Sequence, residues 1–209
     1  MRRLSDEEES LVHSAIGALE IAHGIVPESA LPALTEPALR AAVVERLEQC
    51  GRVLNKVRDG WTSGYDDNVA DVLVREGIGV LKPVDRAVLT LVLLRCVAVP
   101  RARGAASGET WADGRGTRPT STDELAQSRH LTKSMIKQSL RRLQAAGLVN
   151  RGSRGITPGP ALHRLTPRRT AALWEDMVIL AASESPYARV LLKRRGNGNQ
   201  HKPPAKDEK

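Results

Sequence analysis

The chain has few aromatic side chains and no long apolar run. Aromatics make up 2% of its 209 residues, with three Trp, two Tyr and no Phe. This composition argues against modules that stack bases on aromatic platforms, as most single-strand and RNA-binding sheets do, and against aromatic-lined pockets. No segment reaches the roughly 18 apolar residues that a membrane span needs, so we expect no membrane partner.

Cysteines and catalytic motifs are also scarce. Cys50 and Cys96 both fall within segments of apolar periodicity, where we expect small buried side chains and no disulfide framework, as in a reducing cytoplasm. The sequence has no phosphate-binding Gly-rich loop, no paired-Cys zinc spacing and no nucleophile elbow. We therefore expect a cytoplasmic protein that is not an enzyme and uses neither cofactor nor metal.

Charge is distributed unevenly along the chain, whose net charge is +8. Residues 1–100 carry 11 Lys and Arg against 15 Asp and Glu, whereas residues 101–209 carry 21 against 9. Between Arg129 and Arg169 there are ten basic residues and no carboxylate. Surface charges are normally interspersed, so this acid-free window indicates a face directed at a polyanion; the alternative is a solvated, arginine-rich face.

The first half begins with two expected helices. A capping box of Ser5 and Glu8 opens a helix that runs to about His23. A second long helix begins near Pro37, a favourable first-turn residue, with Thr35 as its possible cap.

A β-hairpin follows the second helix. Residues 52–57 alternate with a period of two, Asp59-Gly60 forms a turn, and residues 61–65 return. The Asp-Gly pair indicates a tight turn because glycine tolerates a positive φ. Helix, connector, helix and hairpin in this order are typical of a winged helix.

The middle of the chain contains the most apolar segment. Between Ala87 and Val99 only Thr90 and Arg95 are not apolar, so we expect a buried helix over 83–99 that bridges the two halves. Residues 100–120, which include Trp111, are rich in glycine and proline and are expected to form a long loop.

The second half repeats the order of the first. Ser121 and Glu124 form another capping box, and Thr132 caps a helix over 133–146. A wing is expected over 148–165, with strands at 148–151 and 161–165, followed by a helix that begins at Thr166-Pro167. The tail beyond Arg195 lacks apolar residues and is expected to be disordered.

The helix over 133–146 separates apolar from polar side chains. At 100° per residue, Ile136, Leu140 and Leu143 fall within one sector, while long hydrogen-bond donors occupy the remaining surface. Such donors suit phosphates and base edges, and a Gly/Arg wing suits backbone contact. The candidate DNA contacts are Lys133, Ser134, Lys137, Gln138 and Arg141 on the helix, and Arg151, Arg154 and Arg164 on the wing.

Residues 123–149 resemble the winged helix-turn-helix superfamily. The likeness lies in Asp123-Glu124-Leu125-Ala126, in the leucine-rich segment that ends Ala145-Ala146-Gly147-Leu148-Val149, and in the basic wing; it extends over about 85–182. The resemblance implies a recognition helix at 133–144. Winged helices also serve as protein–protein modules, so it does not by itself imply DNA binding.

The order of elements over the whole chain is similar to that of the accessory subunits of bacterial SMC–kleisin complexes, which resemble MukE. This likeness implies winged helices that bind a kleisin and each other, with some contact to DNA. The strongly basic second unit departs from a purely protein-binding role.

These observations predict a mainly α fold with short β-hairpins, built from tandem winged helix-turn-helix units that a buried helix bridges. We expect an acidic domain over 1–82, a basic domain over 83–182 and an extension over 183–209. The expected function is duplex-DNA binding by a dimeric transcriptional regulator. The alternative is a condensin-like accessory subunit whose acidic half docks a kleisin or SMC partner while the basic half contacts DNA.

Overall fold

The computed structural model describes residues 4–102, 117–128 and 130–199. The expected loop tip, including Trp111, and the last ten residues lie outside this part. The fold is mainly helical with two small antiparallel sheets, as expected. No helix in the described ranges is both long enough and apolar enough to cross a membrane.

The first half is built from helices α1 (Asp6–Ile21), α2 (Pro32–Thr35) and α3 (Pro37–Gln49) and a three-stranded sheet. The sheet has the order β1 (Val26–Pro27), β3 (Gly60–Tyr65), β2 (Arg52–Val57). The capping box of Ser5 and Glu8 opens α1, as expected. The expected cap Thr35 is wrong: Glu36 precedes α3, and the Thr35 hydroxyl donates within α2 to the carbonyl oxygen of Pro32 at 2.7 Å.

The hairpin of β2 and β3 is confirmed, but the reason for its glycine differs from our expectation. Arg58, not Gly60, has the positive φ of 51° in the turn. Gly60 lies opposite Pro27, and a Cβ atom on it would stand 2.5 Å from the carbonyl oxygen of Val26. Gly60 is therefore required for the close approach of β1. Cys50, expected to be buried, is exposed: it is the C-cap residue of α3, one residue past the end of the helix.

Helix α4 (Asp67–Arg75) follows, with Asp66 as its N-cap, and then α5 (Pro83–Leu93), a π-helical segment (Leu94–Ala98) and α6 (Val99–Ala102). The break from α-helical spacing follows from Pro100 together with a hydrogen-bond donor that is distant in the sequence. Pro100 has no N–H, so the carbonyl oxygen of Cys96 lacks its α-helical donor and accepts from the backbone N–H of Arg118 at 3.0 Å instead.

The second half contains α7 (Thr122–Leu125), α8 (Lys133–Ala145), β4 (Val149–Gly152), β5 (Gly155–Pro158), the 3₁₀ helix η3 (Pro160–Arg164) and α9 (Pro167–Ala181). The capping residues expected for α7 and α8 are confirmed, and α9 starts at Thr166-Pro167 as expected, with Thr166 as its N-cap. The wing is shorter than expected, and the return strand predicted over 161–165 is wrong, because β5 already returns at Gly155 and Pro160 begins η3.

A further helix, α10 (Pro186–Asn199), packs on α9. Residues 196–199 are helical, which corrects our expectation of disorder from Arg195 onward; the rest of that tail lies outside the described residues. Ala188 and Leu191, three residues apart on one face of α10, are its buried side chains.

Two separate hydrophobic clusters form the interior. One contains side chains from residues 4–61, with Val12, Leu34 and Val43 fully buried, and the other contains side chains from residues 81–181. Helix α5 packs on α7, α8 and β5, all in the second cluster. The expected bridge between the halves is therefore wrong for this helix, because its buried apolar side chains all belong to the second cluster.

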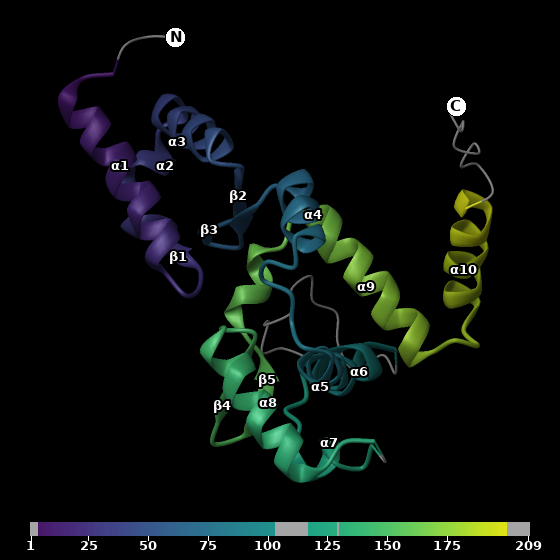
Figure 1. Cartoon of the computed structure of the whole chain (residues 1–209). Coiled ribbons are helices and arrows are strands. Elements are labelled where there is room, and N and C mark those ends of the chain that lie inside the picture. The colour runs from purple at the N-terminus through teal and green to yellow at the C-terminus, as the bar shows by residue number, and fades with distance from the viewer. Residues whose placement is uncertain (1–3, 103–116, 129, 200–209) are drawn as a thin grey trace.

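The two halves meet instead through η3, which packs on β2 and β3 (Figure 1). The amide of buried Asn55 donates to the carbonyl oxygens of Arg164 and Leu165, both at 3.3 Å. Gly64 faces the same turn, and a methyl group there would overlap the carbonyl oxygen of Arg164. This close backbone contact fixes the position of the first hairpin relative to the second half.

Candidate nucleic-acid interface

Helix α8 is anchored by one apolar face. Thr132 caps its first turn by accepting from the backbone N–H of Met135 at 3.2 Å, and Gly147, with φ 68°, ends it. Ile136, Leu140 and Leu143 are fully buried against the second core. The burial of this face fixes the orientation of α8, so that its opposite face is exposed to solvent.

That opposite face carries the predicted contacts. Lys133, Ser134, Lys137, Gln138 and Arg141 are all exposed. Lys133 forms an ion pair with Asp123 at 2.7 Å. Lys137 and Arg141 form no hydrogen bond or ion pair with any residue that the structure describes.

The wing presents two further cations beside the end of α8. Arg151 and Arg154 are exposed on the β4–β5 hairpin, and neither pairs with another described residue. Both line a groove of about 480 Å³ together with Gln144, which lies three residues after Arg141 on the exposed face of α8. The remaining lining residues are Thr117, Pro119, Asn150, Gly152, Ser153, Gly155, Thr157 and Pro158, none of which is acidic.

The wing is extended by a third chain segment. The backbone of Thr120 exchanges two hydrogen bonds with Ile156 of β5, at 2.9 and 2.8 Å. Ile156 is buried, so the hairpin is attached to the second core through this residue and Val149. The tip at Ser153 and Arg154 remains exposed.

A buried ion pair sets the orientation of α8 against α5. The guanidinium group of Arg142 donates two hydrogen bonds to Asp85, at 2.9 and 2.7 Å. The side chain of Asp85 is 5% exposed. The hydrogen bond from Arg142 holds the pKa of Asp85 below its ordinary value, and the same contact raises the pKa of Arg142. Sequence reasoning missed this pair; its only signal was that Arg142 lies outside the face of the helix that carries Lys137 and Arg141.

Arg164, the remaining predicted contact, lies elsewhere. Its guanidinium group donates to the carbonyl oxygens of Leu19 and Ala22 at the end of α1, at 3.5 and 2.5 Å. The prediction placed Arg164 on a return strand, but η3 turns it toward the first half. This arginine therefore neutralises a helix C-terminus and is removed from the candidate interface.

The window from Arg129 to Arg169 contains no carboxylate of its own, but some of its basic residues pair with carboxylates from elsewhere in the chain. Asp67 and Asp71 of α4 pair with Arg169 at 3.3 and 2.5 Å, and Asp67 also lies 3.9 Å from Arg168. The acidic half supplies carboxylates to one end of the window. Among the described basic residues of the window, Lys137, Arg141, Arg151 and Arg154 are the ones without an internal hydrogen bond or ion pair.

Comparisons with known proteins add little. No protein-family model matches the chain, and no curated protein matches it. It is similar to a solved structure described as a conserved hypothetical protein from Chlorobium tepidum, with 16% sequence identity over 82% of this chain and 99% of that chain and a TM-score of 0.31. In the described ranges, no group of three or more His, Cys, Asp or Glu is placed to hold a metal ion.

Proposed function

We propose that the protein binds duplex DNA through the exposed face of α8 and the β4–β5 wing, and that it acts without catalysis as a transcriptional regulator. The observation that carries this proposal is a set of four exposed cations that form no hydrogen bond or ion pair with a described residue, Lys137, Arg141, Arg151 and Arg154. A polyanion with regularly spaced phosphates provides the missing partners and releases its counterions on binding.

The dimensions of the element suit a major groove. With 13 residues, α8 is about 20 Å long at 1.5 Å per residue, and a groove about 12 Å wide admits one helix. Gln138 can pair with base edges, whereas Lys137 and Arg141 reach phosphates. The wing tip then lies along the adjacent backbone.

We further propose that residues 83–182 form a winged helix-turn-helix unit and residues 1–82 a second one. The unit over 83–182 is supported by the succession of α5, α7, α8 and the β4–β5 hairpin. Thr120 pairs with β5 and so adds a third segment to this hairpin. The first half has a similar succession, but its hairpin packs against η3. We therefore assign DNA contact to the second unit alone.

Charge removal from α8 tests the proposal. Fluorescence anisotropy with a labelled duplex would compare the wild type with Lys137→Ala/Arg141→Ala. We expect the double variant to bind at least about tenfold more weakly at moderate salt, since each lost phosphate contact removes one released counterion. Unchanged affinity would refute the assignment.

The control must lose the same charge elsewhere. Lys56→Ala/Arg75→Ala removes two exposed cations from the first half and should leave affinity within about twofold. Thermal melts of both double variants establish that folding is intact. Equal weakening by both would show that net charge, and not the α8 face, determines binding.

As a regulator the protein is proposed to act as a homodimer on a defined operator. Two half-sites would then lie about 34–36 Å apart, one turn of the duplex. Light scattering should give twice the chain mass, and footprinting on genomic fragments should protect one sequence far above random DNA. Uniform protection would favour the second candidate below.

The second candidate is an accessory subunit of an SMC–kleisin complex, and the exposed apolar residues of the acidic half favour it. Val72 and Val74 on α4 and Ile78 and Val80 after it are all exposed. We expect a kleisin segment to cover them in that case. Pull-down should recover a kleisin or SMC protein, identified by mass spectrometry, and Val74→Asp/Ile78→Asp should abolish the recovery. If neither is recovered, this candidate fails.

A further inference from the structure

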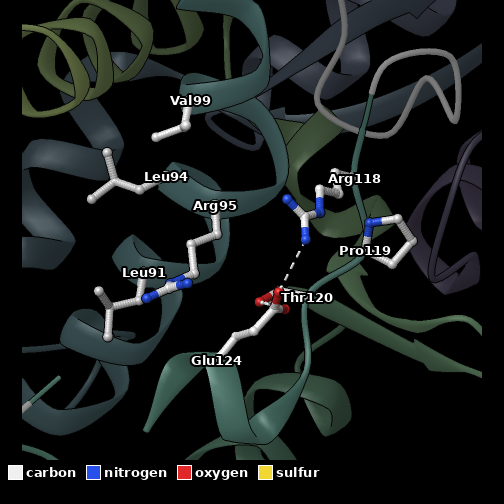
Figure 2. A pocket seen from close by; sticks show the side chains of 8 residues that line it. All are labelled: Leu91, Leu94, Arg95, Val99, Arg118, Pro119, Thr120 and Glu124. Carbon is white, nitrogen blue, oxygen red and sulfur yellow. Dashed lines mark hydrogen bonds and ion pairs between the residues drawn. The ribbon is translucent and has the colours of Figure 1, made fainter. Parts of the chain in front are cut away.

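A pocket of about 350 Å³ lies in the second half and is lined by two chain segments, 91–99 and 118–124 (Figure 2). Leu91, Leu94 and Val99 supply one wall from α5 to α6, and Pro119 supplies another. This volume falls at the lower end of the range of about 300–1,000 Å³ that small-molecule sites occupy.

The pocket owes its shape to the π-helical segment. The backbone N–H of Val99 donates to the carbonyl oxygen of Leu94, five residues earlier, so an extra residue is accommodated in this turn. The carbonyl oxygen of Cys96 then holds the backbone of Arg118 at 3.0 Å. Residues 117–120 are thereby attached beside the helix and form the second wall.

Two arginines from different walls lie at this pocket. Arg95 donates one hydrogen bond, at 3.2 Å, to the neutral amide of Gln127 and forms no ion pair with any described residue. Arg118 lies 3.3 Å from Glu124, longer than the 2.7–2.9 Å of a strong charged pair, and its side chain is 72% exposed. Both guanidinium groups therefore have donors to offer.

The carboxylate at the pocket is already satisfied. Glu124 accepts from the backbone N–H of Ser121 at 2.8 Å and from the hydroxyl of Thr120 at 2.9 Å. These hydrogen bonds, the one from Ser121 foremost, hold the pKa of Glu124 below its ordinary value. Glu124 thus remains anionic and belongs to the helix cap. Two arginines and one carboxylate line the pocket, so Arg95 and Arg118 together leave one positive charge beyond that of Glu124 next to an apolar wall.

We propose that this pocket binds a small organic anion, a carboxylate with an apolar body. The apolar body would pack on Leu91, Leu94 and Val99, and the carboxylate would accept hydrogen bonds from Arg95 and Arg118, since a guanidinium fork matches a carboxylate in two-point geometry. The proposal rests on the pocket alone and does not require DNA binding.

The test uses 1-naphthoate as the probe and its neutral amide, 1-naphthamide, as the matched ligand. Isothermal titration should give saturable one-site binding of naphthoate with a dissociation constant below about 1 mM, and at least tenfold weaker binding of the amide. Arg95→Met keeps an apolar side chain without the charge and should weaken naphthoate at least tenfold. Arg86→Met, on the exposed face of α5, should leave it unchanged.

Arg118→Ala serves as a second variant, because an exposed side chain can be removed without unfolding the protein; it should weaken naphthoate at least threefold. The proposal is overturned if naphthoate does not saturate, if the amide binds equally well, or if Arg95→Met and Arg118→Ala both bind like the wild type. Because no DNA is present, failure here leaves the proposed DNA contact untouched, and the reverse also holds.

Discussion

The two β-hairpins carry cations of the same kind and use them differently. In the first hairpin, Arg52 and Lys56 each form an ion pair with a glutamate of the same half, at 2.8 and 2.6 Å. In the second, Arg151 and Arg154 have no partner among the described residues. The β2–β3 hairpin thus uses its cations for contacts within the protein, whereas the β4–β5 hairpin is proposed to use them for contact with DNA. Whether a cation already has a carboxylate is what separates the two roles.

The largest expected difference concerns a glycine in each hairpin. Gly64→Ala places a methyl group against the carbonyl oxygen of Arg164, so we expect about 3 kcal/mol of destabilisation or a detached first half. Gly152→Ala, where no atom lies within 4 Å, should change the free energy of unfolding by less than about 0.5 kcal/mol. Chemical denaturation measures both. Equal effects would contradict the close docking of the first hairpin.

The next effect concerns the pair that orients α8. Asp85→Asn removes the charged acceptor of Arg142, and we expect a loss of about 2 kcal/mol at neutral pH. Because the pKa of Asp85 is lowered in the folded state, its contribution is present above the ordinary carboxyl pKa and is lost as the pH falls through the folded value.

The acid limb of the stability curve, below about pH 4, should therefore be flatter in this variant than in the wild type. Denaturation at a series of pH values checks this expectation. Asp59→Asn, at the exposed turn of the first hairpin, is the matched control and should leave the acid limb unchanged. An identical acid limb in Asp85→Asn would contradict the assigned role of the pair.

A smaller effect is expected at the wing tip. Arg154→Ala should weaken DNA binding by about 1 kcal/mol and reduce the slope of log affinity against log salt by about one. Lys56→Ala in the first hairpin should change neither quantity, since its charge already has a partner. If Lys56→Ala lowers the slope as much as Arg154→Ala does, the two hairpins do not differ as described.

The smallest effect concerns His163 in η3, between the halves. Burial lowers the pKa of this histidine, so the folded state holds it neutral while the unfolded chain titrates near 6.5. The free energy of unfolding is therefore not reduced by this histidine above pH 6.5, and it declines as the pH falls from 6.5 toward the pKa of the folded state. His163→Gln should remove about 1 kcal/mol or less of that decline. Melting curves of the wild type and the variant at a series of pH values between 5 and 7 measure this decline. If the decline is the same in His163→Gln, it does not arise from His163.

The sequence predicted most helices correctly because their signals are local. Ser5, Ser121 and Thr132 were identified as caps from their own short segments, and Thr166-Pro167 as the start of α9. The amphipathic division of α8 also follows from spacing alone. The exposed positions of Lys137 and Arg141 agree with that spacing, although their role remains a proposal.

Errors arose where distant segments decide the structure. Arg164 was assigned to the wing because nothing local shows that η3 docks on the first sheet. Arg168 and Arg169 appeared free in an acid-free window, yet their carboxylates come from α4, about 100 residues earlier. The π-helical segment was missed as well, because its cause is Pro100 combined with the remote donor Arg118.

The salt dependence of DNA binding tests the central claim most directly. If Lys137, Arg141, Arg151 and Arg154 each neutralise one phosphate, the slope of log affinity against log salt is about −3.6. We expect the wild type to approach this value and Lys137→Ala/Arg141→Ala to fall to about −1.8. Absence of measurable binding at low salt, or a slope that does not change in the double variant, would contradict the account.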